Sequence, residues 1–177
     1  MMPKKEDLDL AYFGISPERG FLANPDPLVS LPKDLAYLDE FGRQLPAMIG
    51  QGRVNSEAKK FPIPSVHQLS SLNNGALQLA WVRYGFIQNA CVHSQQPSAL
   101  ICRNVAWPMW CLSKTLNKPP ILSYDAYTLN NWRRKDQSGP IKVDNLELVQ
   151  TFIEDSDQAW FILIHVDIEY EAAMAIK

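Results

Sequence analysis

The stretch that decides the fold is the last one, residues 160–177, which reads WFILIHVDIEYEAAMAIK. Apolar residues alternate with others from Ile162 to Tyr170, and this period of two predicts a strand. Residues 169–177 are rich in alanine and favour a helix. His165 lies inside the apolar run, so the segment is either a core element with a satisfied histidine or the wall of a reaction site. Because the run ends at Lys177 with nothing after it to pack against, we expect a truncated chain.

Upstream of this stretch the apolar residues recur at helical spacing. A first helix is predicted from about residue 33, with a stop at Gly50 to Gly52. Residues 74–92 are apolar on most faces and predict a central helix, preceded by a short turn at 66–70. Apart from the terminal stretch, the periodicity is helical throughout the chain.

Three shorter helices are expected in the second half of the chain. One spans about 108–116, because Pro108 should begin or kink a helix. Another starts at Asp125 as its cap and ends in Arg133 and Arg134, which we interpret as a solvated helix end. The third covers 144–153 and is followed by an acidic linker.

The amino-terminal part predicts an extended arm. Residues 11–32 contain four prolines and two glycines among apolar and aromatic residues. Proline disfavours the helical region for the residue before it, so no helix should run through this segment. The interspersed apolar residues indicate that the arm packs on a surface.

Composition limits the class of protein. The chain of 177 residues is 46% hydrophobic and 20% charged, which is typical of a globular protein with a buried core. A net charge of −2 gives no electrostatic footprint for nucleic acid or an anionic membrane. The amino end lacks the apolar core of a signal peptide and no run is long enough to span a bilayer, so we expect a cytosolic protein.

Motifs readable from spacing alone carry no chemistry. Cys91, His93, Cys102 and Cys111 lack the paired short knuckle of structural zinc sites, which favours three core thiols and a loop histidine, and no metal site is expected. The segment around Gly50 and Gly52 is not a phosphate loop, and no nucleophile elbow occurs.

Four blocks in order resemble a known family. They are residues 12–28 (YFGISPERGFLANPDPL), 103–114 (RNVA and LSK), 119–132 (PPILSY and NW) and the terminal 161–177. Together they are similar to the amino-terminal part of the indoleamine 2,3-dioxygenase family, especially its fungal branch, and they cover nearly the whole chain.

The resemblance implies an all-α enzyme that uses haem b and its iron. It would insert both atoms of dioxygen across the indole C2–C3 bond of L-tryptophan, the first step of the kynurenine pathway. By position, Phe161 matches the aromatic that packs on the substrate indole, and Tyr124 and Tyr127 match residues of the same distal pocket. His165 falls at the distal catalytic position, where a neutral imidazole could accept a hydrogen bond from the indole N–H. The resemblance also overrides the strand prediction and implies a buried helix at 161–177.

The resemblance further implies two domains, one of them incomplete. Residues 1–153 would form a small helical cap domain with the arm, and residues 154–177 a linker and the first helix of a truncated haem domain. The family's axial histidine would lie beyond residue 177, since neither His67 nor His93 matches its position. The isolated chain is therefore expected to be inactive, and the complete protein to be a monomer that binds tryptophan and dioxygen. The alternative hypothesis is a haem-free helical module that interacts with other proteins or has no role.

Overall fold

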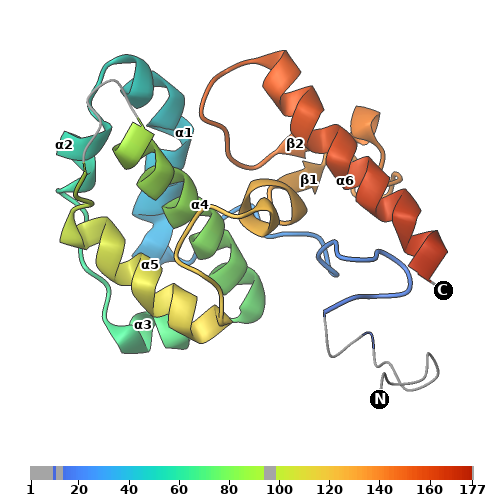
Figure 1. The fold of residues 1–177 in the computed structure, drawn as a ribbon, viewed down its shortest axis with the longest axis horizontal. Coiled ribbons are helices and arrows are strands. Elements are labelled where there is room, and N and C mark those ends of the chain that lie inside the picture. The colour runs from blue at the N-terminus through green and yellow to red at the C-terminus, as the bar shows by residue number, and fades with distance from the viewer. Residues whose placement is uncertain (1–9, 11–13, 94–98, 177) are drawn as a thin grey trace.

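A computed structural model describes residues 10, 14–93 and 99–176. Helices α1 to α5 gather in one bundle, while a two-stranded sheet and the long helix α6 lie beside it (Figure 1). The elements are the 3-10 turn η3 (Lys33–Leu35), α1 (Ala36–Gly50), α2 (Val54–Ala58), α3 (Val66–Ser70), α4 (Asn74–His93), α5 (Arg103–Leu116), the π-helical turn η4 (Asp125–Leu129), β1 (Trp132–Arg134), the 3-10 turn η5 (Val143–Asn145), β2 (Leu146–Leu148) and α6 (Ser156–Ile176). The all-α prediction is confirmed, with the small sheet as an addition.

The bundle is built around α4. This helix packs against α1, α2 and α5, and residues 79–87 of it are all buried. A helix that is apolar on nearly every face is stable only where other elements surround it. The predicted central helix over 74–92 and the predicted helix from about residue 33 to Gly50 are therefore both confirmed.

The arm runs without a helix from Gly14 to Pro32, as predicted, and residues 11–13 of the prediction lie outside the described part. Leu22 and Leu31 on the arm are buried. Asp26 fixes its middle, because the carboxylate accepts hydrogen bonds from Arg19 of the arm and Arg134 of β1. Burial alone would raise the pKa of Asp26, but these hydrogen bonds hold that pKa below its ordinary value.

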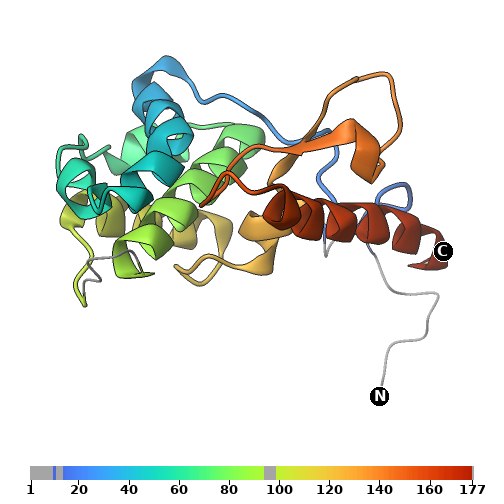
Figure 2. The same cartoon turned by 90° about the horizontal axis from the view of Figure 1, so that it is seen from above.

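A second apolar cluster joins the arm, the sheet and α6. β1 and β2 pair antiparallel, with Trp132 opposite Leu148, and the ring of Trp132 is fully buried among side chains of the arm and α6. Seen from above, α6 lies lengthwise beside this hairpin (Figure 2). The buried members of this second apolar cluster are Leu22, Trp132, Ile141, Leu146, Leu163 and Val166. The cluster thus connects segments that the sequence assigns to two domains, and the boundary at residues 153 and 154 stays a prediction.

A buried polar network holds the segment that leads to α6. Arg83 of α4 donates to Asp39 of α1 at 3.1 Å and to the Gln150 side chain at 2.7 Å. The Gln150 amide in turn donates to the Gly42 carbonyl at 3.0 Å. That carbonyl has no partner four residues on, because Pro46 lacks an N–H. Gln150 therefore satisfies an acceptor that a proline inside α1 leaves open.

Three of the predicted short helices are wrong in type or extent. α5 begins at Arg103 and runs through the buried Pro108, not from it. In place of a helix over 125–134, the chain forms η4 and then β1, and Asp125 does not cap it. Arg133 and Arg134 therefore lie in a strand and not at a helix end. In place of a helix over 144–153, the chain forms η5 and β2.

The terminal stretch is a helix, as the family resemblance implies, and the strand prediction from its alternation is wrong. The helix is not buried on all faces as expected, since Phe161, Ile168 and Met174 are each more than half exposed. The predicted turn at 66–70 is the short helix α3. Cys91 and Cys111 are buried free thiols and Cys102 is a partly exposed one. Among the described helices, none is both long and apolar enough to cross a membrane.

Candidate functional site

Helix α6 presents three of its side chains on one face. Phe161, His165 and Glu169 are spaced by four residues, which places them one above the other on a helix. The rings of Phe161 and His165 lie 4.8 Å apart between centroids, and Phe161 is 56% exposed. This face is therefore available for a ligand or a partner.

The geometry of His165 fixes which ring nitrogen carries the proton. Its Nδ1 lies 2.6 Å from the carbonyl oxygen of Phe161. Because a carbonyl can only accept, Nδ1 is the donor, and Nε2 of the neutral ring then carries the lone pair. Nε2 has no hydrogen-bond partner among the described residues. His165 thus offers one hydrogen-bond acceptor beside an exposed aromatic ring.

Tyr124 reaches the same group from the turn before η4. Its ring stands edge-on to His165, with centroids 6.3 Å apart and planes at 77°. Its hydroxyl donates to Glu169 Oε1 at 3.1 Å. Burial and the Glu169 carboxylate raise the pKa of Tyr124 to about 12, so the phenol keeps its proton at neutral pH. We call Tyr124, Phe161 and His165 the aromatic group.

Tyr127 lies apart from the aromatic group. Its ring stacks on Phe86 and Phe152 at the edge of the bundle core, with centroids 5.6 Å and 6.4 Å away. Its hydroxyl accepts a hydrogen bond from Gln158 at 3.3 Å. The structure therefore brings together three of the four residues that the sequence selects, and a pocket role for Tyr127 stays a prediction.

Glu169 is a site residue that the sequence analysis missed. It orients the Tyr124 hydroxyl across the gap between η4 and α6. Its position eight residues after Phe161 places Glu169 on the same helical face, but this relation is visible only if the stretch is interpreted as a helix.

The surroundings of the aromatic group remain strongly apolar at the surface. Among the large exposed side chains of this part are Ile121, Trp160 and Ile168, each more than half exposed. Single exposed apolar residues are ordinary, but this many on one helix and the adjacent turn indicate a binding face. In the described part of the chain, no three His, Cys, Asp or Glu side chains converge as metal ligands.

The fold and the site define a mainly helical protein whose long terminal helix presents a hydrogen-bond acceptor between two aromatic rings. Sequence comparison then gives the family. Residues 9–177 match the model of the indoleamine 2,3-dioxygenase family, and the chain belongs to that family.

Mammalian and fungal relatives both match nearly the whole chain. Indoleamine 2,3-dioxygenase 1 of Mus musculus is 34% identical over 92% of this chain and 40% of its own length. Indoleamine 2,3-dioxygenase 2 of Homo sapiens is 31% identical over 96% of this chain and 42% of its own. The Saccharomyces cerevisiae indoleamine 2,3-dioxygenase is 25% identical over 90% of this chain and 37% of its own. The chain thus spans about two fifths of the length of these curated relatives.

Proposed function

We propose that this chain supplies the distal wall of a haem-dependent dioxygenase that converts L-tryptophan and dioxygen to N-formylkynurenine. Both atoms of dioxygen would enter the product as the indole C2–C3 bond breaks. The overall reaction would therefore consume no reductant. One observation carries the proposal within the family: Nδ1 of His165 is bound to the Phe161 carbonyl, which leaves Nε2 as an acceptor beside two aromatic rings.

The chain's own residues would bind and orient the substrate. Nε2 of His165 accepts a hydrogen bond from the indole N–H, which fixes the rotation of the indole ring within its own plane. Phe161 packs on the ring face and excludes water from the C2–C3 bond. Glu169 holds the Tyr124 hydroxyl, so that the Tyr124 ring keeps its edge toward the imidazole. Orientation of this kind accelerates a reaction because the reacting atoms no longer search for their geometry.

The residues present fit one face of a haem. A porphyrin is a flat apolar plate, and the exposed rings and aliphatic side chains of α6 offer the matching surface. Phe161 and His165 would lie on the substrate side of the plate. The haem iron would supply the redox chemistry that activates dioxygen.

The isolated chain should not perform the reaction. Neither His67 nor His93 matches the family's axial position, and a haem without an axial ligand binds weakly and without a defined reactivity. We expect a titration of the chain with haem to give no sharp Soret band and no stoichiometric endpoint. A sharp, stoichiometric Soret band, or kynurenine formed by the chain alone, would overturn this expectation.

The experiment on function uses the protein that contains this chain together with the family's haem-binding remainder. His165→Ala should lower kcat/KM for L-tryptophan about 10–100-fold, which is the effect of losing one buried hydrogen bond to the substrate. N1-methyl-tryptophan lacks the N–H, so its kcat/KM should change much less in the same variant. Asp157→Asn is the matched control, since Asp157 lies exposed in the first turn of the same helix. Equal losses for both substrates would exclude the N–H contact, and unchanged kinetics would remove His165 from the site.

A further inference from the structure

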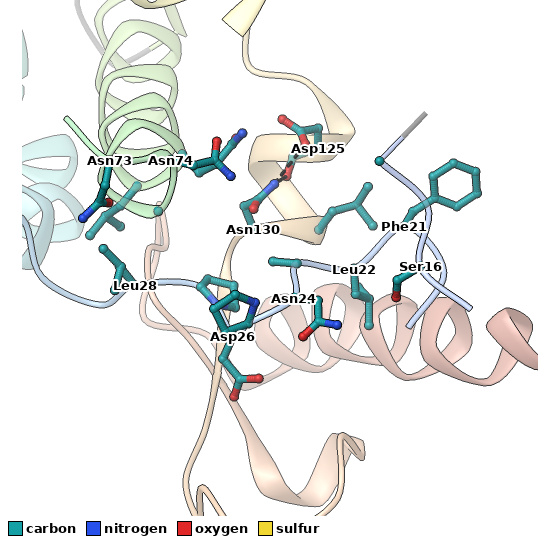
Figure 3. Close-up of a pocket in the computed structure, with 18 of the residues that line it drawn as sticks. Ser16, Phe21, Leu22, Asn24, Asp26, Leu28, Asn73, Asn74, Asp125 and Asn130 are labelled. Atoms are coloured by element: carbon teal, nitrogen blue, oxygen red, sulfur yellow. Dashed lines mark hydrogen bonds between the residues drawn. The ribbon is translucent and has the colours of Figure 1, made fainter. Parts of the chain in front are cut away.

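A cavity of about 880 Å³ lies between the arm and the bundle, away from the aromatic group. Arm residues 14–28 form one wall, and the start of α4, Lys118 and η4 form the other (Figure 3). None of Tyr124, Phe161 and His165 is among its lining residues. Its volume is typical of small-molecule sites, which range over roughly 300–1,000 Å³.

The charged side chains that line the cavity are all paired within the protein. Lys118 Nζ lies 2.6 Å from Asp125 Oδ2, and the carboxylate of Asp26 is held by Arg19 and Arg134. A charged ligand would find no unpaired charge of opposite sign in the cavity, so no ion pair would compensate for the loss of its hydration shell. The cavity therefore favours a neutral ligand.

The Lys118–Asp125 ion pair also orients two carboxamides in the lining. Lys118 Nζ donates to Gln78 Oε1 at 2.9 Å, so the Gln78 amide nitrogen is directed away from the ammonium. On the other side of the pair, Asn130 Nδ2 donates to Asp125 Oδ1 at 2.9 Å, which leaves the Asn130 oxygen as the open group (Figure 3). An ammonium can only donate and a carboxylate can only accept, so neither carboxamide can flip without losing its bond. Two residues of the lining thus keep one open group each, the donor Gln78 Nε2 and the acceptor Asn130 Oδ1.

The rest of the lining contains both apolar side chains and the polar residues Ser16, Asn24, Asn73 and Asn74. Phe21 and Leu28 on the arm are 50% and 40% exposed and offer apolar surface to the cavity, whereas Leu22 and Leu79 are each 2% exposed and offer almost none. A ligand that satisfies the donor and the acceptor can place an apolar body against Phe21 and Leu28.

We propose that this cavity binds a neutral small molecule that carries an amide group on an apolar, ring-sized body, with its carbonyl accepting from Gln78 and its N–H donating to Asn130. The proposal stands on the cavity, the closed ion pairs and the two oriented carboxamides. It is independent of haem and of tryptophan oxidation.

Three probes of nearly the same shape test it: benzamide, benzoate and benzamidine, which are neutral, anionic and cationic at neutral pH. Binding to the chain of 177 residues is followed by saturation-transfer NMR and by the side-chain amide resonances of Gln78 and Asn130. Benzamide should bind with a dissociation constant on the order of 1–10 mM, as expected for a fragment of this size. The two charged probes should bind about ten-fold more weakly or not at all. Equal binding of all three probes, or no binding of benzamide, would overturn the proposal.

Variants of the lining separate this site from unspecific apolar binding. Gln78→Leu and Asn130→Leu should each weaken benzamide about five-fold, whereas Gln137→Leu, at an exposed glutamine outside the cavity, should not. Lys118→Met leaves Asp125 uncompensated and should turn the preference toward benzamidine. Asp125→Asn leaves Lys118 uncompensated and should turn it toward benzoate. Far-UV circular dichroism checks that each variant is folded. If the order of affinity for the three probes is the same in both charge variants as in the parent chain, the assigned geometry is refuted.

Discussion

Replacing Asp39 with alanine should lower the free energy of unfolding by about 4 kcal/mol. The Asp39–Arg83 pair is buried, with side chains 10% and 5% exposed. Breaking such a pair leaves an uncompensated charge in the interior and typically costs about 3–5 kcal/mol. Arg83 keeps two acceptors, the Val149 carbonyl and the Gln150 side chain, so the lower part of that range applies. The Leu31 N–H loses the carboxylate that accepts from it at 2.7 Å, which adds about 1 kcal/mol.

Urea denaturation followed by circular dichroism and by the fluorescence of the buried Trp81 and Trp132 measures the change. The double variant Asp39→Leu, Arg83→Met should be more stable than Asp39→Ala, because it removes both charges together. The control is Glu40→Ala, where an exposed carboxylate of the same helix pairs with the exposed Arg43 and no measurable change is expected. A loss below about 1 kcal/mol for Asp39→Ala, or a double variant no more stable than Asp39→Ala, would refute a buried, coupled pair.

Three further predictions concern the anchoring of the arm and the bundle. The pKa of Asp26 is depressed in the folded state from its ordinary value of 3.8, so its contribution to stability is complete above that value and is lost as the pH falls through the folded pKa. Acid titration of stability should thus show a smaller loss below about pH 4 in Asp26→Asn than in the parent chain. Gly42→Ala should destabilise the fold by about 1–3 kcal/mol in a denaturation experiment, because the added methyl group meets the side-chain oxygen of Gln150, and Gln150→Ala should relieve part of that loss. Ser65→Ala removes the capping box that Ser65 and Gln68 form at α3 and should cost about 1 kcal/mol, with Ser70→Ala as the comparison.

Local periodicity predicts the helices of the bundle and fails for the hairpin. α1 carries an apolar face over fifteen residues, long enough for the helical period to be plain. α4 is apolar on nearly every face over twenty residues, and this length favours a buried helix over a strand. β1 and β2 are three residues each, too short for an alternation to register. What holds them is distant in sequence, since Arg134 pairs with Asp26 across 108 positions. No pattern within a window of the sequence contains that contact.

Pro108 misled the prediction for a related reason, whereas the helix that contains Pro46 was predicted with its full length. A proline inside a helix removes one N–H and should end or kink the helix unless the freed carbonyl finds another partner. In α1 that partner is Gln150, which reaches the Gly42 carbonyl from the segment between β2 and α6. In α5 the ring of Pro108 is buried against the bundle, and packing carries the helix through. Tertiary contacts thus decide positions where local chemistry alone predicts a boundary.

The terminal helix α6 carries more apolar residues than its packing against the rest of the chain requires. Ile162, Leu163 and Val166 face the interior and fix α6 in place. The carboxylate of Asp167 adds hydrogen bonds from the Val143 N–H and Lys142. Phe161 and Ile168 take no part in that anchoring, and each remains 56% exposed. Exposed apolar area of this kind gives no stability to the chain itself, so its value must come from something that covers it. The alternation that resembled a strand is therefore the trace of a helix with apolar side chains on two faces, one packed in the core and one exposed beside His165.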